Sequence, residues 1–276
     1  MIIQTNSEIE DKQPIKSERL NNTSTSLHHN GKFYDLFEDN AIGGARHSDD
    51  ISFWRDIAKL YSGSILELGS GTGRVAIDLA ELGFDVTGLE ISDSMLSVAK
   101  TKSSQVSWIK GDACNFDLRK MFQLILFPYN GMLHIYSDEL KSCFHTIKKH
   151  INLTGRLVID IANPTPSILL KLFLNQGERL ASIFEDPNGT GTVIVTQDSE
   201  YDAASQVITT KRNYRFTGTH KEVYDSFKRR IYFPEEIDTL LRWSGFEIEE
   251  KYGDYDFSPF TSDSPQQLIV CQPVSI

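Results

Sequence analysis

The residues best placed to do chemistry gather around a glycine-rich run. Gly69, Gly71 and Gly73 follow a short apolar stretch, residues 65–68, and come directly before a helical pattern. Glycine lets the backbone turn sharply and approach a ligand closely. The N–H groups at the start of a helix have no partner within the helix and can bind that ligand. Because a tight strand-to-helix turn also needs glycine, the loop by itself is weak evidence for a ligand.

Two carboxylates downstream strengthen the case for a binding site. Glu90 closes the second apolar stretch, residues 85–89, where a carboxylate can accept hydrogen bonds from both hydroxyls of a ribose. Asp112 and Ala113 follow the third stretch, residues 106–109, within reach of the exocyclic amine of an adenine. The carboxyl ends of parallel strands meet at one edge of a sheet, so the sequence predicts an adenosine site there.

The loop fits a dinucleotide such as NAD poorly. The third glycine of the G-x-G-x-x-G fingerprint would stand at position 74, which is Arg74. Glu67 lies just before the loop, where a carboxylate repels a pyrophosphate but attracts a ligand with an ammonium or sulfonium charge. The pattern therefore favours a positively charged adenosine compound.

These residues resemble the class I S-adenosylmethionine (SAM)-dependent methyltransferases. Residues 67–74 read ELGSGTGR, and residues 86–96 read VTGLEISDSML, close to the family pattern ELGxGTGR…VTGxDxSxxML. Glu90 stands where aspartate is commoner. The resemblance covers roughly residues 34–271 and implies a Rossmann-like α/β fold of seven mostly parallel strands, the last antiparallel. It also implies that SAM is the cofactor and S-adenosylhomocysteine its product.

The resemblance further indicates which residues contact the cofactor. Tyr34 falls in N-terminal helices that close over SAM in a small-molecule subgroup, so it is expected to be a lid tyrosine. Tyr34 and Met95 also fit a plain packing role. The expected cofactor contacts are Tyr34, Glu67, Gly69, Gly71, Arg74, Glu90, Ile91, Met95, Asp112, Ala113 and Phe127.

The segment at residues 127–134, FPYNGMLH, is expected to face the methyl acceptor. It resembles the FNSxxHL stretch of small-molecule methyltransferases, which include glycine and amino-sugar N-methyltransferases. Asn130 and His134 match that stretch, while the residues around them depart from it. Tyr129, Asn130 and His134 are the expected substrate contacts, and His134 and Tyr34 the expected catalytic residues. A structural role for His134 stays open.

The resemblance predicts N-methylation of a small-molecule amine by in-line displacement, in which the enzyme mainly aligns the reacting atoms and excludes water. An amine must be neutral when it attacks, and histidine, with an unperturbed pKa of about 6.5, suits the role of base. The alternative is an O-methyltransferase acting on a hydroxyl or a carboxylate. A catalytically silent SAM-binding scaffold is a further alternative, which the intact loop and both acidic partners disfavour.

Strand and helix patterns alternate through the first half of the chain, as in a parallel sheet with helices on both faces. The expected strands are residues 65–68, 85–89, 106–109, 123–127 and 156–161, and the expected helices are residues 75–82, 93–102 and 137–150. A helix at residues 234–244 and closing strands at 246–255 and 267–271 resume this pattern later.

Between these parts, the chain changes character. Stretches rich in Val, Ile, Thr and Tyr at residues 192–201, 206–216 and 222–232 predict an inserted antiparallel meander. Which of its residues face the substrate stays open, because a one-residue register error reverses the face. The predicted organisation is a disordered tail (1–30), N-terminal lid helices (31–62) jointed at Gly43 and Gly44, a SAM-binding Rossmann-like domain (63–165 and 233–276) and an inserted antiparallel substrate cover (166–232).

Composition narrows the function classes. The 276 residues are 39% hydrophobic and carry a net charge of −10, which disfavours a nucleic-acid partner. No apolar run has the length of a membrane span, and the N-terminus lacks the apolar core of a secretory signal. The spacing of Cys114, Cys143 and Cys271 suggests neither disulfides nor a metal site. We therefore expect a cytoplasmic enzyme with a small-molecule acceptor. Because no Asp-Asp-Asn metal cluster of the catechol type is apparent, we also expect it to be metal-independent. The sequence does not indicate its oligomeric state.

Overall fold

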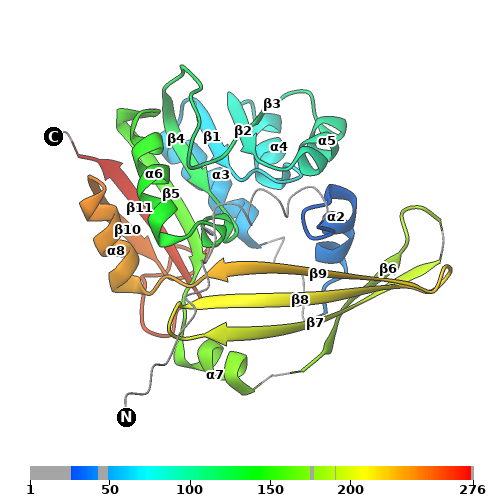
Figure 1. Cartoon of the computed structure of the whole chain (residues 1–276). Coiled ribbons are helices and arrows are strands. Elements are labelled where there is room, and N and C mark those ends of the chain that lie inside the picture. The colour runs from blue at the N-terminus through cyan, green and yellow to red at the C-terminus, as the bar shows by residue number, and fades with distance from the viewer. Residues whose placement is uncertain (1–25, 43–48, 175–176, 190, 275–276) are drawn as a thin grey trace, which may run out of the picture.

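A seven-stranded sheet forms the centre of the molecule. The computed structural model describes residues 26–42, 49–174, 177–189 and 191–274. The strand order is β10-β11-β5-β4-β1-β2-β3, and β11 is antiparallel to both β5 and β10 while the other pairings are parallel (Figure 1). This confirms the expected sheet and its antiparallel last strand. The strands are β1 (Ile65–Leu68), β2 (Val86–Glu90), β3 (Ser107–Lys110), β4 (Phe122–Phe127), β5 (Ile151–Ala162), β10 (Phe246–Tyr252) and β11 (Gln266–Pro273).

Helices cover both faces of this sheet, as the sequence predicts. Successive residues of a strand point to opposite faces, and β1 divides accordingly: Ile65 packs with α3 and α4, whereas Leu66 packs with α6 and α8. Each face of the sheet thus carries its own cluster of buried apolar side chains. Because the central strands are buried on both faces, their sequences are nearly uninterrupted hydrophobic runs. The helices are α3 (Asp49–Tyr61), α4 (Arg74–Glu81), α5 (Asp93–Lys102), α6 (Ser137–Lys148) and α8 (Pro234–Trp243).

A second, antiparallel sheet lies across one end of the first (Figure 1). Its order is β6-β7-β8-β9, and β7, β8 and β9 match the three expected strands of the meander. The first strand, β6, and the preceding helix, α7, were not foreseen. The bounds are α7 (Pro166–Leu174), β6 (Arg179–Glu185), β7 (Thr192–Asp202), β8 (Val207–Phe216) and β9 (Lys221–Arg230).

The N-terminal helix α2 (Gly31–Asp39) packs on the inner face of this second sheet. Its Phe33 and Phe37 lie against Tyr214 and Phe216 in a separate apolar cluster. Asn30 caps the helix by accepting hydrogen bonds from the first backbone N–H groups. On its other side, α2 contacts the glycine loop, where the Thr72 hydroxyl donates to the Asp35 carboxylate at 2.6 Å.

The chain is ordered before the boundary that we drew at residue 30. Ser26 and His28 are buried, because the Ser26 hydroxyl and the His28 N–H both donate to the Asp225 carboxylate on β9, at 2.7 and 2.8 Å. Residues 26–30 therefore belong to the packed structure, while residues 1–25 and the predicted Gly43–Gly44 joint lie outside the described residues.

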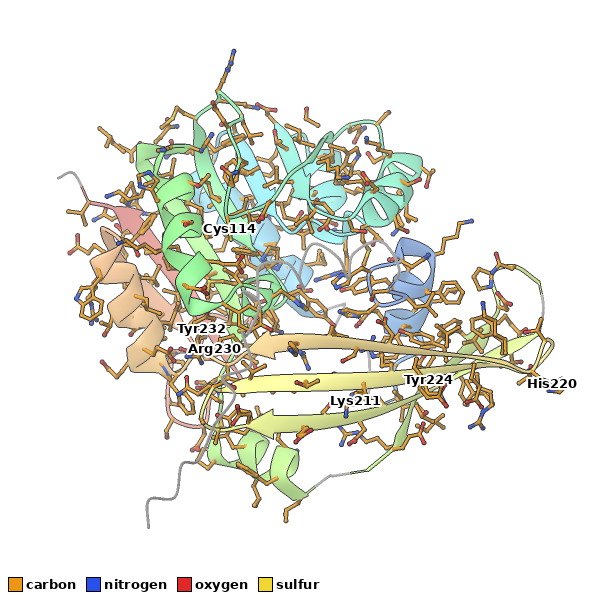
Figure 2. All side chains as sticks on the ribbon, viewed as in Figure 1. Cys114, Lys211, His220, Tyr224, Arg230 and Tyr232 are labelled. Carbon is orange, nitrogen blue, oxygen red and sulfur yellow. The ribbon has the colours of Figure 1, made fainter. Side chains whose placement is uncertain are left out.

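Specific contacts join the second sheet to the first. Tyr232 follows β9, is fully buried, and donates from its hydroxyl to the Ile135 carbonyl at 2.6 Å (Figure 2). The side-chain amide of Gln267 donates to the Tyr232 carbonyl at 3.0 Å. All three cysteines are free and buried. No helix among the described residues combines the length and the apolarity needed to cross a membrane.

Candidate active site

A cavity of about 1740 Å³ lies between the carboxyl ends of the central strands, helix α2 and the inner face of the second sheet. Every residue that the sequence proposed as a cofactor or substrate contact lines it. These residues are Tyr34, Glu67, Gly69, Gly71, Arg74, Glu90, Ile91, Met95, Asp112, Ala113, Phe127, Tyr129, Asn130 and His134. The fold therefore brings the whole set together, while their individual roles remain predictions.

Two glycines of the loop have different roles. Gly71 and Gly73 have φ of +55° and +92°, a left-handed conformation that side chains rarely adopt. A Cβ atom on Gly71 would meet nothing within 4 Å, so this residue exposes its backbone to the cavity. A Cβ atom on Gly73 would lie 2.5 Å from the Trp108 ring, so this glycine is needed for packing.

Among the described residues, one oxygen of the buried Glu67 carboxylate has no hydrogen-bond partner. The side chain is 4% exposed, and Oε2 has no hydrogen-bond partner within the described structure. Burial raises the pKa of Glu67 to about 8, against the opposing effects of Arg74 and of the Ala76 backbone N–H. An ammonium group in the cavity would supply the missing partner. The carboxyl thus fits the amino-acid end of SAM.

Arg74 is held by an acid that sequence reasoning missed. Its two terminal nitrogens donate to the two oxygens of Asp50 on α3, each at 2.7 Å, and Asp50 also accepts from the Trp54 indole at 3.2 Å. The guanidinium lies 5.2 Å from the centre of the Tyr129 ring. Arg74 therefore lines the cavity with its charge already compensated, which favours a positioning role over direct ligand binding.

The two acids of the expected adenosine site are held by backbone groups. Glu90 accepts from the N–H of Gly71 at 3.0 Å and from the N–H of Ser92 at 2.7 Å, and burial raises its pKa. Asp112 accepts from the N–H of Cys114 at 2.9 Å. Both carboxylates thus line the cavity at the ends of β2 and β3 in defined orientations, where the sequence expects ribose and adenine.

The positions of Tyr34 and Met95 fit both of their possible roles, contact with the cofactor and packing. The Tyr34 ring is centred 5.9 Å from the His28 ring, and burial raises its pKa well above 10.0, so the phenol stays protonated. Met95 on α5 is only 5% exposed, yet it still lines the cavity. Each side chain is therefore packed and also adjacent to the space for a ligand.

The loop after β4 is strained and firmly tied down. Tyr129 and Asn130 both have positive φ, 51° and 61°. Asp160 accepts from the Tyr129 N–H at 2.8 Å, and the Asn130 side-chain oxygen accepts from the Ala162 N–H at 2.7 Å. The Tyr129 hydroxyl donates to Glu38 on α2 at 2.9 Å. The matching Asn130 therefore stabilises the loop, and its expected contact with substrate stays a prediction.

His134 has two histidine neighbours that the sequence did not reveal. It ends the short helix η1 (Gly131–His134), and its ring centre lies 6.0 Å from those of both His28 and His29. Burial lowers the pKa of His28 well below 6.5 and also lowers that of His29. These two were missed because they fall in a polar segment that reads as tail. The cavity thus contains two imidazoles, those of His28 and His29, that stay neutral near pH 7.

Arginines of the second sheet complete the cavity. Arg212 on β8 and Arg229 on β9 line it, together with the Phe227 ring between them. Arg215, three residues beyond Arg212, points away and pairs with Glu222 at 3.1 Å. Strand register decides which residues face inward, and the sequence alone did not fix that register.

Comparisons with known proteins identify related methyltransferases. A family model described as a methyltransferase domain matches residues 65–155. The putative methyltransferase YqeM of Bacillus subtilis is 25% identical over 221 residues, which cover 75% of this chain and 83% of that protein.

Two solved structures share the fold. An S-adenosylmethionine-dependent methyltransferase from Clostridium acetobutylicum aligns with a TM-score of 0.72 at 18% identity, over 88% of this chain and 98% of that one. The sugar N-methyltransferase KedS8 from Streptoalloteichus aligns with a TM-score of 0.69 at 19% identity, over 100% and 99%. With its glycine loop, buried Glu67 and acids at successive strand ends, the chain belongs to the class I SAM-dependent methyltransferases.

Proposed function

We propose that this enzyme methylates a nitrogen atom of a small-molecule amine. The observation that carries this proposal is the group of imidazoles on the acceptor side of the cavity, His134 with His28 and His29. Methylation of a neutral amine produces an ammonium that must lose a proton, and a neutral imidazole can accept it. The sugar N-methyltransferase KedS8 has the same fold, which supports the proposal.

Different residues bind the cofactor and accept the proton. Bound SAM supplies an activated methyl group on its sulfonium. Glu67 compensates the positive charge at the amino-acid end, and the Gly71 backbone lets the cofactor come close. His134 is the proton acceptor. The Nδ1 atom of His28 accepts a hydrogen bond from Arg212 at 3.1 Å, which leaves that nitrogen unable to accept a proton from substrate.

One observation favours a second candidate, O-methylation of a carboxylate. Arg212 and Arg229 line the same cavity, and guanidinium groups bind carboxylates well. The two candidates differ in the product, because a methyl ester is hydrolysed by mild alkali whereas an N-methyl group is not.

A transfer assay tests the proposal. The full-length protein is incubated with SAM labelled in its methyl group and with a panel of amines and carboxylic acids, and the labelled products are then treated with alkali. Alkali-stable label in the amine fraction is expected. Replacement of the proton acceptor, His134→Asn, should lower kcat by about a hundredfold. The control is His145→Asn, which changes an exposed histidine on α6 outside the cavity. Alkali-labile label from the acids alone would contradict N-methylation.

A further inference from the structure

The second sheet places two arginines on one face, toward the cavity. Residues that pair directly in antiparallel strands point to the same side, and Arg212 pairs with Asp225 while Arg229 pairs with Ile208. Both guanidinium groups lie beside the Phe227 ring, 4.9 and 5.7 Å from its centre. Two positive charges are thus held at one position in the cavity wall.

Within the part of the chain that the structure describes, neither arginine has a carboxylate partner. Arg212 is only 7% exposed and donates to the neutral groups of Gln197, at 3.2 Å, and His28, at 3.1 Å. The Nε atom of Arg229 is buried without a hydrogen-bond partner, and burial lowers the pKa of Arg229. Among the described residues, no acidic side chain lies within 4.0 Å of either guanidinium.

The nearby acids are already engaged elsewhere. Asp225, which pairs with Arg212 in the strand register, accepts from the Ser26 hydroxyl and the His28 N–H. Glu38, which faces Arg229 more distantly, accepts from the Tyr129 hydroxyl. Burying a charge is costly unless it is paired. The arrangement therefore has positive charge without a hydrogen-bonded carboxylate among the described residues, and a ligand could supply one.

His28 adds a third donor to this wall. Arginine has hydrogen-bond donors and no acceptor, so the Nδ1 atom of His28 that receives the Arg212 bond must be unprotonated. His28 stays neutral because burial lowers its pKa, so its hydrogen is on Nε2. The ring stacks on Phe227 at 3.8 Å. Arg212, Arg229 and His28, the arginine wall, thus present donors to the cavity.

We propose that the arginine wall binds an oxyanion, a carboxylate or phosphate group of the methyl acceptor, separate from the atom that receives the methyl group. The inference rests on the proposed function in that the acceptor occupies this cavity. The acceptor is then an amine that carries an acidic group. The wall anchors this group by charge-assisted hydrogen bonds and so orients the amine.

Direct anion binding tests the wall without knowledge of the acceptor. Acetate and inorganic phosphate are titrated separately into the full-length protein by calorimetry, with and without saturating S-adenosylhomocysteine. Arg212→Gln and Arg229→Gln should each weaken binding of the preferred anion by about tenfold. Lys211→Gln is the matched control, because Lys211 is the exposed neighbour of Arg212 on β8 and lies outside the cavity (Figure 2).

The outcomes separate the two proposals. Loss of anion binding in both arginine variants but not in Lys211→Gln supports the wall, provided that thermal unfolding and S-adenosylhomocysteine affinity match the wild type. The preferred anion identifies the acidic group as carboxylate or phosphate. Absence of anion binding by the wild type, or equal binding by all variants, overturns the inference. If only acids gain alkali-labile label in the transfer assay, N-methylation is overturned. The titration would still show whether the arginine wall binds an anion.

Discussion

Binding of S-adenosylhomocysteine should release a proton from Glu67. The pKa of this carboxyl is about 8 in the ligand-free protein, so at pH 7 it holds a proton in about 90% of molecules. The ammonium group of the ligand favours the ionised carboxylate and lowers that pKa. Provided that it falls to about 5 or lower, about 0.9 proton leaves Glu67 for each ligand bound at pH 7.

The same linkage sets how affinity depends on pH. Below its ligand-free pKa of about 8, Glu67 must lose a proton for the ligand to bind, so affinity rises with pH. Between pH 6 and pH 7 the gain is about ninefold, or about 1.3 kcal/mol. Glu67→Gln removes the titrating group, so this variant should lose the pH dependence. It should also bind about 30-fold more weakly at pH 7, because an ion pair worth about 2 kcal/mol is lost.

Isothermal calorimetry in two buffers of different ionisation enthalpy measures the proton count directly. Glu81→Gln, an exposed change near the end of α4, controls for the loss of one carboxylate. Equal proton release by the wild type and Glu67→Gln would refute the reasoning, as would a wild type that releases none.

Three further changes probe the loop, the buried ion pair and the histidines. Gly71→Val should abolish S-adenosylhomocysteine binding measured by calorimetry, whereas Gly73→Val should chiefly lower the melting temperature; the reverse result would contradict the two assigned roles. Asp50→Asn leaves Arg74 without its counterion and should cost about 3 kcal/mol in urea unfolding, and a loss under about 0.5 kcal/mol would show that the pair is dispensable. Burial lowers the pKa of His28 in the folded state, so only the unfolded state gains a proton as the pH falls just below 6.5. The free energy of unfolding should therefore decrease by up to about 1.4 kcal/mol per pH unit as the pH is lowered there. His28→Gln should flatten that fall in thermal unfolding, and an unchanged slope would argue against it.

The sequence predicted the central sheet well, since its strands are short apolar runs bounded by glycine or charge. The strand at residues 65–68 and the helix at residues 93–102 have the same bounds in the structure. The first part of β5 was missed, because residues 152–154 alternate little and are largely exposed. Helix α7 was missed because it is apolar nearly all round, with no amphipathic period to identify it.

The cofactor side of the site was predictable and the acceptor side was not, for a physical reason. Glu67, Gly71 and Glu90 lie close together in the sequence, on adjacent strands whose ends must meet. His28 joins the site through contacts with Asp225, 197 residues away, which no local pattern records. The inward direction of Arg212 depends on strand register, which a sequence without a clear polar alternation leaves open.

The way in which the second sheet is attached has a consequence for changing the enzyme's specificity. The strands of this sheet lie between β5 and α8 in the sequence, so they do not interrupt the segments that form the expected cofactor loops. Residues 26–42 nevertheless pack on its inner face through His28, Phe33 and Phe37. A chimaera with the acceptor pocket of another enzyme would therefore need two separate segments replaced together, the N-terminal segment and the second sheet.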